Sequence, residues 1–92
     1  MSEERRTLTI VNKRGLHARA SAKFVGAVAA LPDNVSVKVA KGSNEAAGGS
    51  ILGLMMLGAA KGDQIDLIVS GENASTVMAD IAAMVEDGFG EE

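Results

Sequence analysis

The sequence predicts an α+β fold: a two-layer, open-faced sandwich in which a four-stranded, mainly antiparallel sheet carries three helices on one face. Short segments that alternate polar and apolar residues have the period of half-buried strands. Other segments repeat apolar residues at helical spacing. The order is β-α-β-β-α-β-α, and each segment has a single apolar face. One core shared between a sheet and a layer of helices buries all of these faces.

The first half of the chain has clear local signals. Residues 7–11 alternate polar and apolar side chains and indicate a strand, and the polar, Gly-containing stretch 12–15 predicts a turn. Residues 18–31 carry an apolar stripe at helical spacing, and Pro32 ends this predicted helix. Residues 35–39, with the sequence Val-Ser-Val-Lys-Val, alternate most cleanly and predict the second strand.

The second half contains one strand, two helices and a weaker strand signal. Residues 45–47 indicate a short third strand, and 50–57 predict a short helix that starts at Ser50. Residues 65–70 alternate again and predict the fourth strand. The last helix is expected to be capped by Asn73 or Ser75, with an apolar face of Val77, Ile81, Met84 and Val85.

The length of 92 residues predicts a single domain over 1–92, with frayed ends at 1–5 and 89–92. Without Cys the chain forms no disulfide and no Cys-based zinc site, and we expect neither a metal nor a cofactor. The sequence shows no secretory signal and no apolar segment long enough to span a bilayer. We therefore expect a cytoplasmic monomer that does not insert into membranes.

Charge is distributed unevenly along the chain. Residues 5–32 contain six Lys or Arg and no acid, whereas 71–92 contain six acids and no base. A nucleic-acid binder is expected to be basic overall and to offer aromatic side chains for stacking. This chain has a net charge of -3 and only two aromatic residues, so nucleic-acid binding is disfavoured. A local basic patch fits an anionic ligand or an acidic partner protein better.

The single histidine, His17, lies where the first loop becomes a helix. The first turn of a helix leaves backbone N–H groups unpaired, and together with the helix dipole they attract anions. The donors here are the N–H groups of Ala18, Arg19 and Ala20, joined by the Arg19 side chain. A neutral imidazole beside them could accept a phosphoryl group. The commoner use of a lone histidine at this position is a cap or a surface residue. A metal site or hydrolytic triad is disfavoured because no acid lies nearby in the sequence.

Two motifs resemble those of one known family. Gly15-Leu16-His17-Ala18-Arg19 resembles the active-site signature of HPr, the histidine phosphocarrier of the bacterial phosphotransferase system. Residues 49–58, followed by Ala-Lys-Gly-Asp at 60–63, resemble the family's regulatory-serine segment. Ala20 departs from the proline that the family usually has there. The Arg-Ala-Ser form of residues 19–21 and the ending 88–92 are closer to the nitrogen-related NPr branch.

The resemblance implies a phosphocarrier that serves sugar transport or nitrogen regulation and is a stoichiometric carrier, not an enzyme. His17 would receive a phosphoryl group on Nδ1 from phosphorylated enzyme I, which takes it from phosphoenolpyruvate, and would pass it to a IIA protein. Arg19 would stabilise the phosphoryl group. Ser50 would be the regulatory phosphorylation site of an HPr kinase/phosphorylase, although a serine there is also an ordinary helix N-cap.

An apolar patch is expected to dock the partner proteins. It would consist of Ile51, Leu52, Met55 and Met56, and the basic residues Arg14, Arg19 and Lys23 would surround it. Two other functions stay open at this stage: a small ligand-binding regulatory α+β domain without phosphotransfer, and an interaction module without chemistry. A deep apolar pocket would favour the ligand-binding domain.

Overall fold

The computed structural model describes residues 2–91, and its elements follow one another in the predicted order. A short 3₁₀ turn is added after the last helix. The elements are β1 (Ser2–Thr9), α1 (Ala18–Ala29), β2 (Val35–Lys41), β3 (Asn44–Ala47), α2 (Ile51–Met56), β4 (Gln64–Gly71), α3 (Ala74–Glu86) and η1 (Gly88–Gly90).

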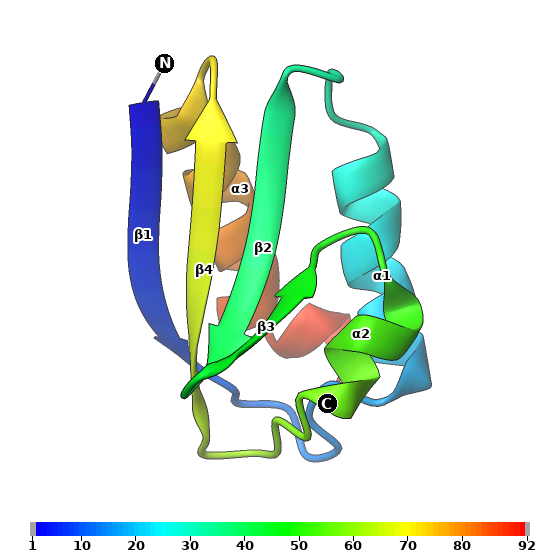
Figure 1. Cartoon of the computed structure of the whole chain (residues 1–92). Coiled ribbons are helices and arrows are strands. Elements are labelled where there is room, and N and C mark those ends of the chain that lie inside the picture. Colours follow the sequence, from blue (N-terminus) through cyan, green and yellow to red (C-terminus); the bar gives the residue numbers. More distant parts are fainter. Residues whose placement is uncertain (1, 92) are drawn as a thin grey trace.

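The four strands form one antiparallel sheet in the order β1-β4-β2-β3. Figure 1 shows α1 and α3 behind this sheet, with α3 behind β1 and β4. The short helix α2 packs against α1 and β3. The predicted open-faced sandwich is confirmed. Within residues 2–91, no helix combines the length and the apolar character that crossing a bilayer requires.

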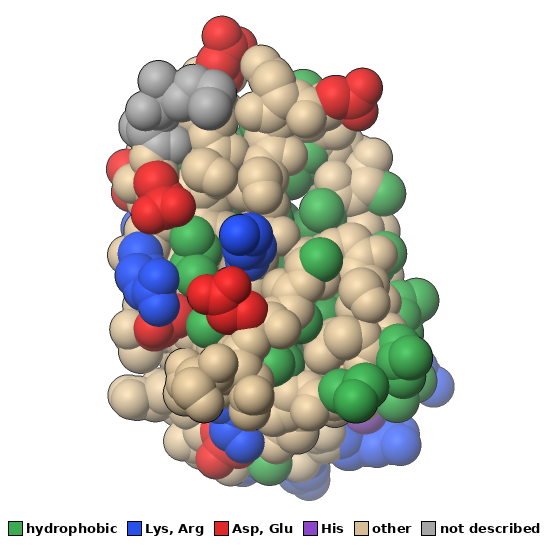
Figure 2. Space-filling view, in the orientation of Figure 1, with side chains coloured by type: hydrophobic (Ala, Val, Ile, Leu, Met, Phe, Trp, Pro, Cys, Tyr) green, Lys and Arg blue, Asp and Glu red, His purple; other side chains and the backbone are tan. Residues whose placement is uncertain are grey.

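Alternate residues of the central strands build the core. Val37 lies opposite Val69, and Val39 lies opposite Leu67, so their side chains share the face that the helices cover. The helices add Phe24, Leu54, Met78, Ile81 and Val85, all nearly inaccessible to solvent. The other face of the sheet is open and displays charged side chains among polar ones (Figure 2).

The first strand begins earlier than residues 7–11 predict. β1 starts at Ser2, pairs with β4 along its whole length and ends at Thr9, while Val11 is 45% exposed. Residues 2–6 show no alternation of polar and apolar side chains. They can still pair with β4, because an edge strand pairs through its backbone groups alone. Across this pair Asp66 of β4 accepts hydrogen bonds from Thr7 (2.7 Å) and Arg5 (3.2 Å).

The prediction of frayed ends at 1–5 and 89–92 is also corrected. Residues 2–5 belong to β1, and Phe89 of η1 is only 2% exposed. Lys23 donates a hydrogen bond of 2.7 Å to the Phe89 carbonyl, which ties η1 to α1. Burying one aromatic ring is enough to hold a short tail on the domain. Residues 1 and 92 lie outside the described residues.

Candidate functional site

The loop before α1 is held in one conformation by Gly15. Its φ is +62°, and a Cβ atom at this position would lie 2.2 Å from the carbonyl oxygen of Ala59. The next residue, Leu16, donates its N–H to the same oxygen at 3.0 Å. Only glycine combines this backbone conformation with so close an approach. The loop therefore reverses tightly against the segment after α2 and delivers His17 to the start of α1.

His17 is the N-cap residue of α1. Its backbone is extended, its carbonyl accepts the N–H of Ser21 at 2.9 Å, and its side chain does not cap the helix. Helix geometry leaves the N–H groups of Ala18, Arg19 and Ala20 without intrahelical acceptors. Ala18 and Arg19 are exposed, but Ala20 is 0% exposed within the core. The prediction that Ala20 offers its N–H to an anion is corrected, because its amide is not accessible.

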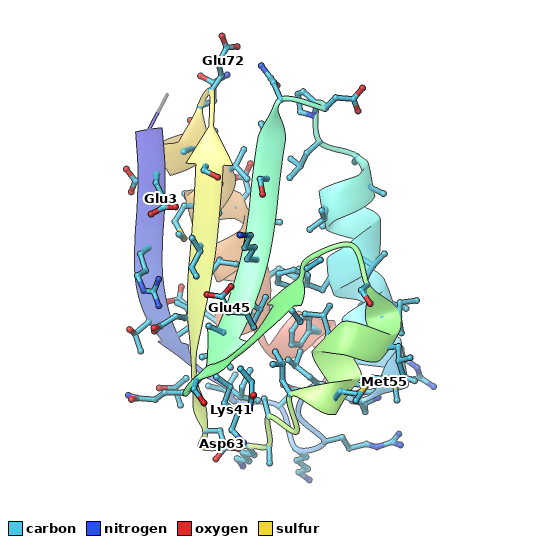
Figure 3. The ribbon with its side chains drawn as sticks, in the orientation of Figure 1. Glu3, Lys41, Glu45, Met55, Asp63 and Glu72 are labelled. Carbon is cyan, nitrogen blue, oxygen red and sulfur yellow. The ribbon has the colours of Figure 1, made fainter. Side chains whose placement is uncertain are left out.

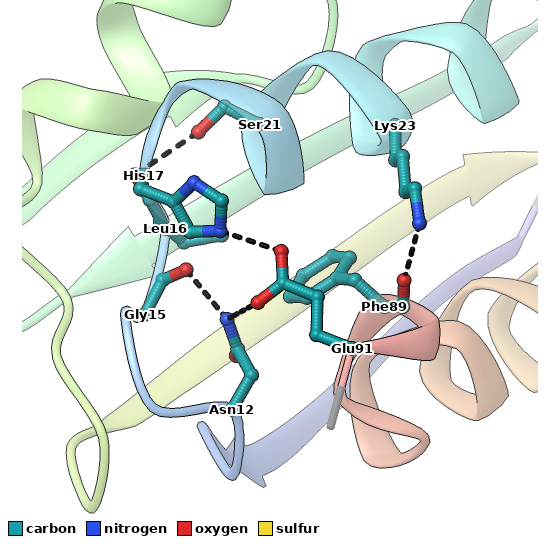
Figure 4. A network of polar contacts seen from close by, with 8 residues as sticks. All are labelled: Asn12, Gly15, Leu16, His17, Ser21, Lys23, Phe89 and Glu91. Carbon is teal, nitrogen blue, oxygen red and sulfur yellow. Dashed lines mark hydrogen bonds and ion pairs between the residues drawn. The ribbon is translucent and has the colours of Figure 1, made fainter.

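A carboxylate from the other end of the chain meets the His17 ring (Figure 4). The ring nitrogen Nε2 lies 2.5 Å from Oε2 of Glu91. Asn12 donates from Nδ2 to the other oxygen of Glu91 at 3.1 Å and to the Gly15 carbonyl at 2.8 Å. The side chains of His17 and Glu91 are 12% and 19% exposed. Because no acid lies close to His17 along the chain, the sequence predicts no carboxylate beside its ring, and this prediction is wrong.

The surroundings of Glu91 favour its charged form. Desolvation raises the pKa of Glu91, but hydrogen bonds from Asn12 and His17, together with the nearby positive charge, outweigh it and hold the pKa below the usual glutamate range. An ionised carboxylate only accepts hydrogen bonds, so the proton of this contact belongs to Nε2. The neutral ring then has its lone pair on Nδ1.

An open cleft of about 450 Å³ lies beside the ring. Four cationic side chains line it and outnumber the single carboxylate. The lining residues are Lys13, Arg14, His17, Arg19, Lys23, Gly90 and Glu91. Arg14 and Arg19 are exposed, and neither forms an ion pair within the described part of the chain. This arrangement attracts an anion to the ring. No cluster of His, Asp or Glu that could hold a metal ion occurs in residues 2–91.

The hydroxyl of Ser21 is not available to this cleft. It donates to the Leu16 carbonyl at 3.1 Å, and the residue is 0% exposed. A helical serine commonly bonds to a carbonyl in this way. The polar groups that can meet an anion at the ring are therefore the N–H groups of Ala18 and Arg19 and the cations of the cleft.

Ser50 lies at the start of α2, where its hydroxyl accepts the N–H of Gly53 at 2.9 Å. Beyond it, four apolar side chains of α2 point to solvent while Leu54 is buried. Their exposed fractions are 41% for Ile51, 68% for Leu52, 41% for Met55 and 77% for Met56. Figure 2 shows hydrophobic side chains gathered over α2, with Lys and Arg side chains and the single histidine next to them. The four residues expected to form the apolar patch are therefore all exposed.

Figure 3 shows Met55 and the Lys41–Asp63 pair at the same end of the molecule. Lys41 lies 3.3 Å from Asp63, which also accepts the Ala60 N–H at 2.9 Å. Because Ala60 follows the carbonyl that contacts Gly15, these bonds brace the loop that supports the His17 loop.

Sequence reasoning missed Glu91 and Asn12 as residues of the site. The charge asymmetry was the available signal, because the acidic region 71–92 ends against the basic region 5–32. It could not identify which carboxylate pairs with the ring. The pairing depends on the direction that the chain takes after η1, and the burial of Phe89 in the core sets this direction.

Comparison with known proteins yields a consistent set of matches. A family model described as "PTS HPr component phosphorylation site" matches residues 4–87. The phosphocarrier protein HPr of Pseudomonas putida is 43% identical over 86 residues, which cover 94% of each chain. The phosphocarrier protein NPr of Shewanella violacea is 36% identical over 91 residues, covering 99% of this chain and 98% of that protein. The crystal structure of HPr-C-His from Thermoanaerobacter tengcongensis superimposes with a TM-score of 0.88 at 31% identity, covering 97% and 98% of the two chains.

Proposed function

The chain belongs to the HPr family of phosphocarrier proteins of the phosphotransferase system, and we propose that His17 is the residue that accepts and releases the phosphoryl group. The observation that carries this proposal is the placement of the ring. It lies at the start of α1, beside first-turn amides that have no intrahelical acceptor and a cleft with four cations. Each of these features favours a dianionic group on the histidine.

The transfer step follows from the hydrogen bond at Nε2. With the proton on Nε2, the Nδ1 lone pair forms the new bond to phosphorus. The bond between phosphorus and the donor breaks, and its electron pair stays on the donor. The N–H groups of Ala18 and Arg19, which have no intrahelical acceptor, and the Arg19 guanidinium then hold the phosphoryl oxygens. Transfer to the acceptor is the same step in reverse, so His17 is regenerated and the protein acts as a carrier, not as an enzyme.

The family works with the other proteins of the phosphotransferase system. We assign enzyme I as the donor and a IIA protein as the acceptor, with the chain acting as a cytoplasmic monomer. The exposed apolar residues Ile51, Leu52 and Met55 are the docking surface, with Arg14 and Lys23 beside the cleft. Docking there would bring an acidic partner within reach of His17.

Ser50 is proposed as the site of an HPr kinase/phosphorylase. Its hydroxyl oxygen already accepts the Gly53 N–H, so phosphorylation would replace a neutral cap by a dianion at the edge of the apolar patch. That charge would oppose docking of an acidic partner.

The alternative of a ligand-binding domain required a deep apolar pocket. The cleft beside His17 is instead open and lined by charged side chains. This charged lining favours a phosphoanion over an apolar metabolite.

Incubation with enzyme I and labelled phosphoenolpyruvate tests the proposal. Wild-type protein should acquire one acid-labile, alkali-stable label, and His17→Ala should acquire none. Arg19→Ala should be labelled more slowly, with unchanged melting temperature, because it removes a charge from the phosphoryl site and nothing from the core. Label retained in His17→Ala would refute the assignment. Separate reactions with sugar-type and nitrogen-type enzyme I identify the branch.

A further inference from the structure

The C-terminal segment is built to present one carboxylate to the His17 ring. Phe89 anchors it in the core, and both Phe89 and Gly90 have positive φ, which turns the chain sharply back toward α1. Lys23 holds the Phe89 carbonyl. These contacts restrict the segment before Glu91 makes any bond, so placing the carboxylate costs little additional conformational entropy.

The Glu91 carboxylate has a partner for each oxygen. Oε2 meets Nε2 of His17 at 2.5 Å, and Oε1 accepts from Nδ2 of Asn12 at 3.1 Å. Asn12 is itself 2% exposed and bonded to the loop through the Gly15 carbonyl. The carboxylate is thus fixed on both sides, and so is the ring that it contacts. Figure 4 shows the other ring nitrogen on the side of α1, away from Glu91.

We propose that Glu91 is a positioning residue for phosphoryl transfer: it orients the His17 ring and supplies the negative charge that balances the ring after transfer. The inference rests on the proposed function. When Nδ1 of the neutral ring bonds to phosphorus while Nε2 keeps its proton, the ring becomes a cation. No proton has to leave, because the carboxylate that faces Nε2 compensates the charge.

The other charges around the ring do not supply this compensation. Lys13 and Arg14 of the loop and Arg19 and Lys23 of α1 are all positive, so they favour the incoming phosphoryl group but oppose a cationic ring. Glu91 is the only carboxylate that lines the cleft within residues 2–91. The arrangement is that of a carboxylate behind a histidine, which stabilises the imidazolium without accepting its proton.

The test compares Glu91→Gln with wild type, with Glu91→Ala and with Glu86→Gln as the control. Glutamine keeps the shape and an acceptor oxygen but removes the charge, and Glu86 is an exposed acid at the end of α3. We expect both Glu91 variants to be labelled by enzyme I about 10-fold more slowly, the equivalent of about one pK unit of charge interaction. Glu86→Gln should be labelled at the wild-type rate.

A spectroscopic readout separates positioning from a loss of fold. Proton and ¹⁵N NMR of the unphosphorylated protein should show a slowly exchanging Nε2 proton on His17 that is lost in Glu91→Ala. In the phosphorylated protein, the Nε2 proton should exchange with solvent faster in Glu91→Gln than in wild type, because the neutral amide holds it less strongly.

Equal labelling rates for Glu91→Gln and wild type, faster labelling of Glu91→Gln, or equal slowing by Glu86→Gln would each overturn the inference. An absent Nε2 proton in the wild-type protein would do so as well. None of these results touches the proposed function, which fails only if His17→Ala is still labelled.

Discussion

At the scale of single residues, the site depends on a glycine that takes no part in the chemistry. Gly15 has a left-handed backbone and lies against the Ala59 carbonyl. Both constraints exclude a side chain, and both come from contacts that bring distant loops together. Gly15 also belongs to the segment that resembles the active-site signature of the family. Glycine is nevertheless required there for steric reasons, because a side chain would not fit.

Gly15→Ala should therefore destabilise the protein by at least about 2 kcal/mol, because it adds a strained backbone conformation to a clash with a carbonyl. Gly26→Ala is the matched control. Gly26 lies in α1, and a Cβ there meets nothing within 4 Å, so alanine should stabilise the helix by about 0.5–1 kcal/mol. Urea unfolding of both variants measures the difference. Equal stability of the two variants would contradict the role assigned to Gly15.

At the scale of elements, the helix starts use different chemistry. Ser50 caps α2 with its hydroxyl, whereas Asn73 precedes α3 with a left-handed backbone and no side-chain cap. The side chain of His17 does not cap α1, and its Nε2 contacts Glu91 instead. The start of α1 is thus left open, which an anion-binding end requires and an ordinary capped end does not provide.

Ser50→Ala should reduce the free energy of unfolding by about 1 kcal/mol, the usual contribution of a serine N-cap. Ser75→Ala provides the control, because Ser75 is exposed within the first turn of α3 and its hydroxyl forms no hydrogen bond to residues 2–91. Its replacement should leave stability unchanged or slightly raised, since alanine is the better helix former. Thermal unfolding compares the two. A similar loss in both variants, or no loss in Ser50→Ala, would contradict the capping role of Ser50.

At the scale of the whole molecule, ion pairs join segments that are far apart in sequence. The pKa of Asp63 is lowered by hydrogen bonds from the Ala60 N–H and from Lys41. The pKa of Asp66 is lowered mainly by the Thr7 hydroxyl and further by Arg5, despite some desolvation. A carboxyl whose pKa is lower in the folded state contributes stability above its unfolded-state pKa, and this stability is lost as the pH falls through the folded-state value.

The free energy of unfolding should consequently decrease as the pH falls below about 4. Replacing both acids in Asp63→Asn/Asp66→Asn should flatten this decrease and lower stability at neutral pH. Asp80→Asn, at an exposed position of α3, should leave the profile as it is. Urea unfolding between about pH 2 and pH 7 is the measurement. A profile of the double variant that parallels the wild type would mean that other groups control acid unfolding.

The sequence alone determined the order of elements and the open-faced sandwich, and it identified His17 as the candidate site residue. Strand and helix periodicities and short motifs are local properties, and Val35–Lys41 and Ala18–Ala29 depend on little else. Tertiary structure decided the rest. β1 reaches back to Ser2 because backbone pairing does not need apolar side chains, and Ala20 loses its accessible amide to core packing. Glu91 meets a ring 74 positions away only because the buried Phe89 directs the tail there, and no local pattern encodes the distance between two distant segments.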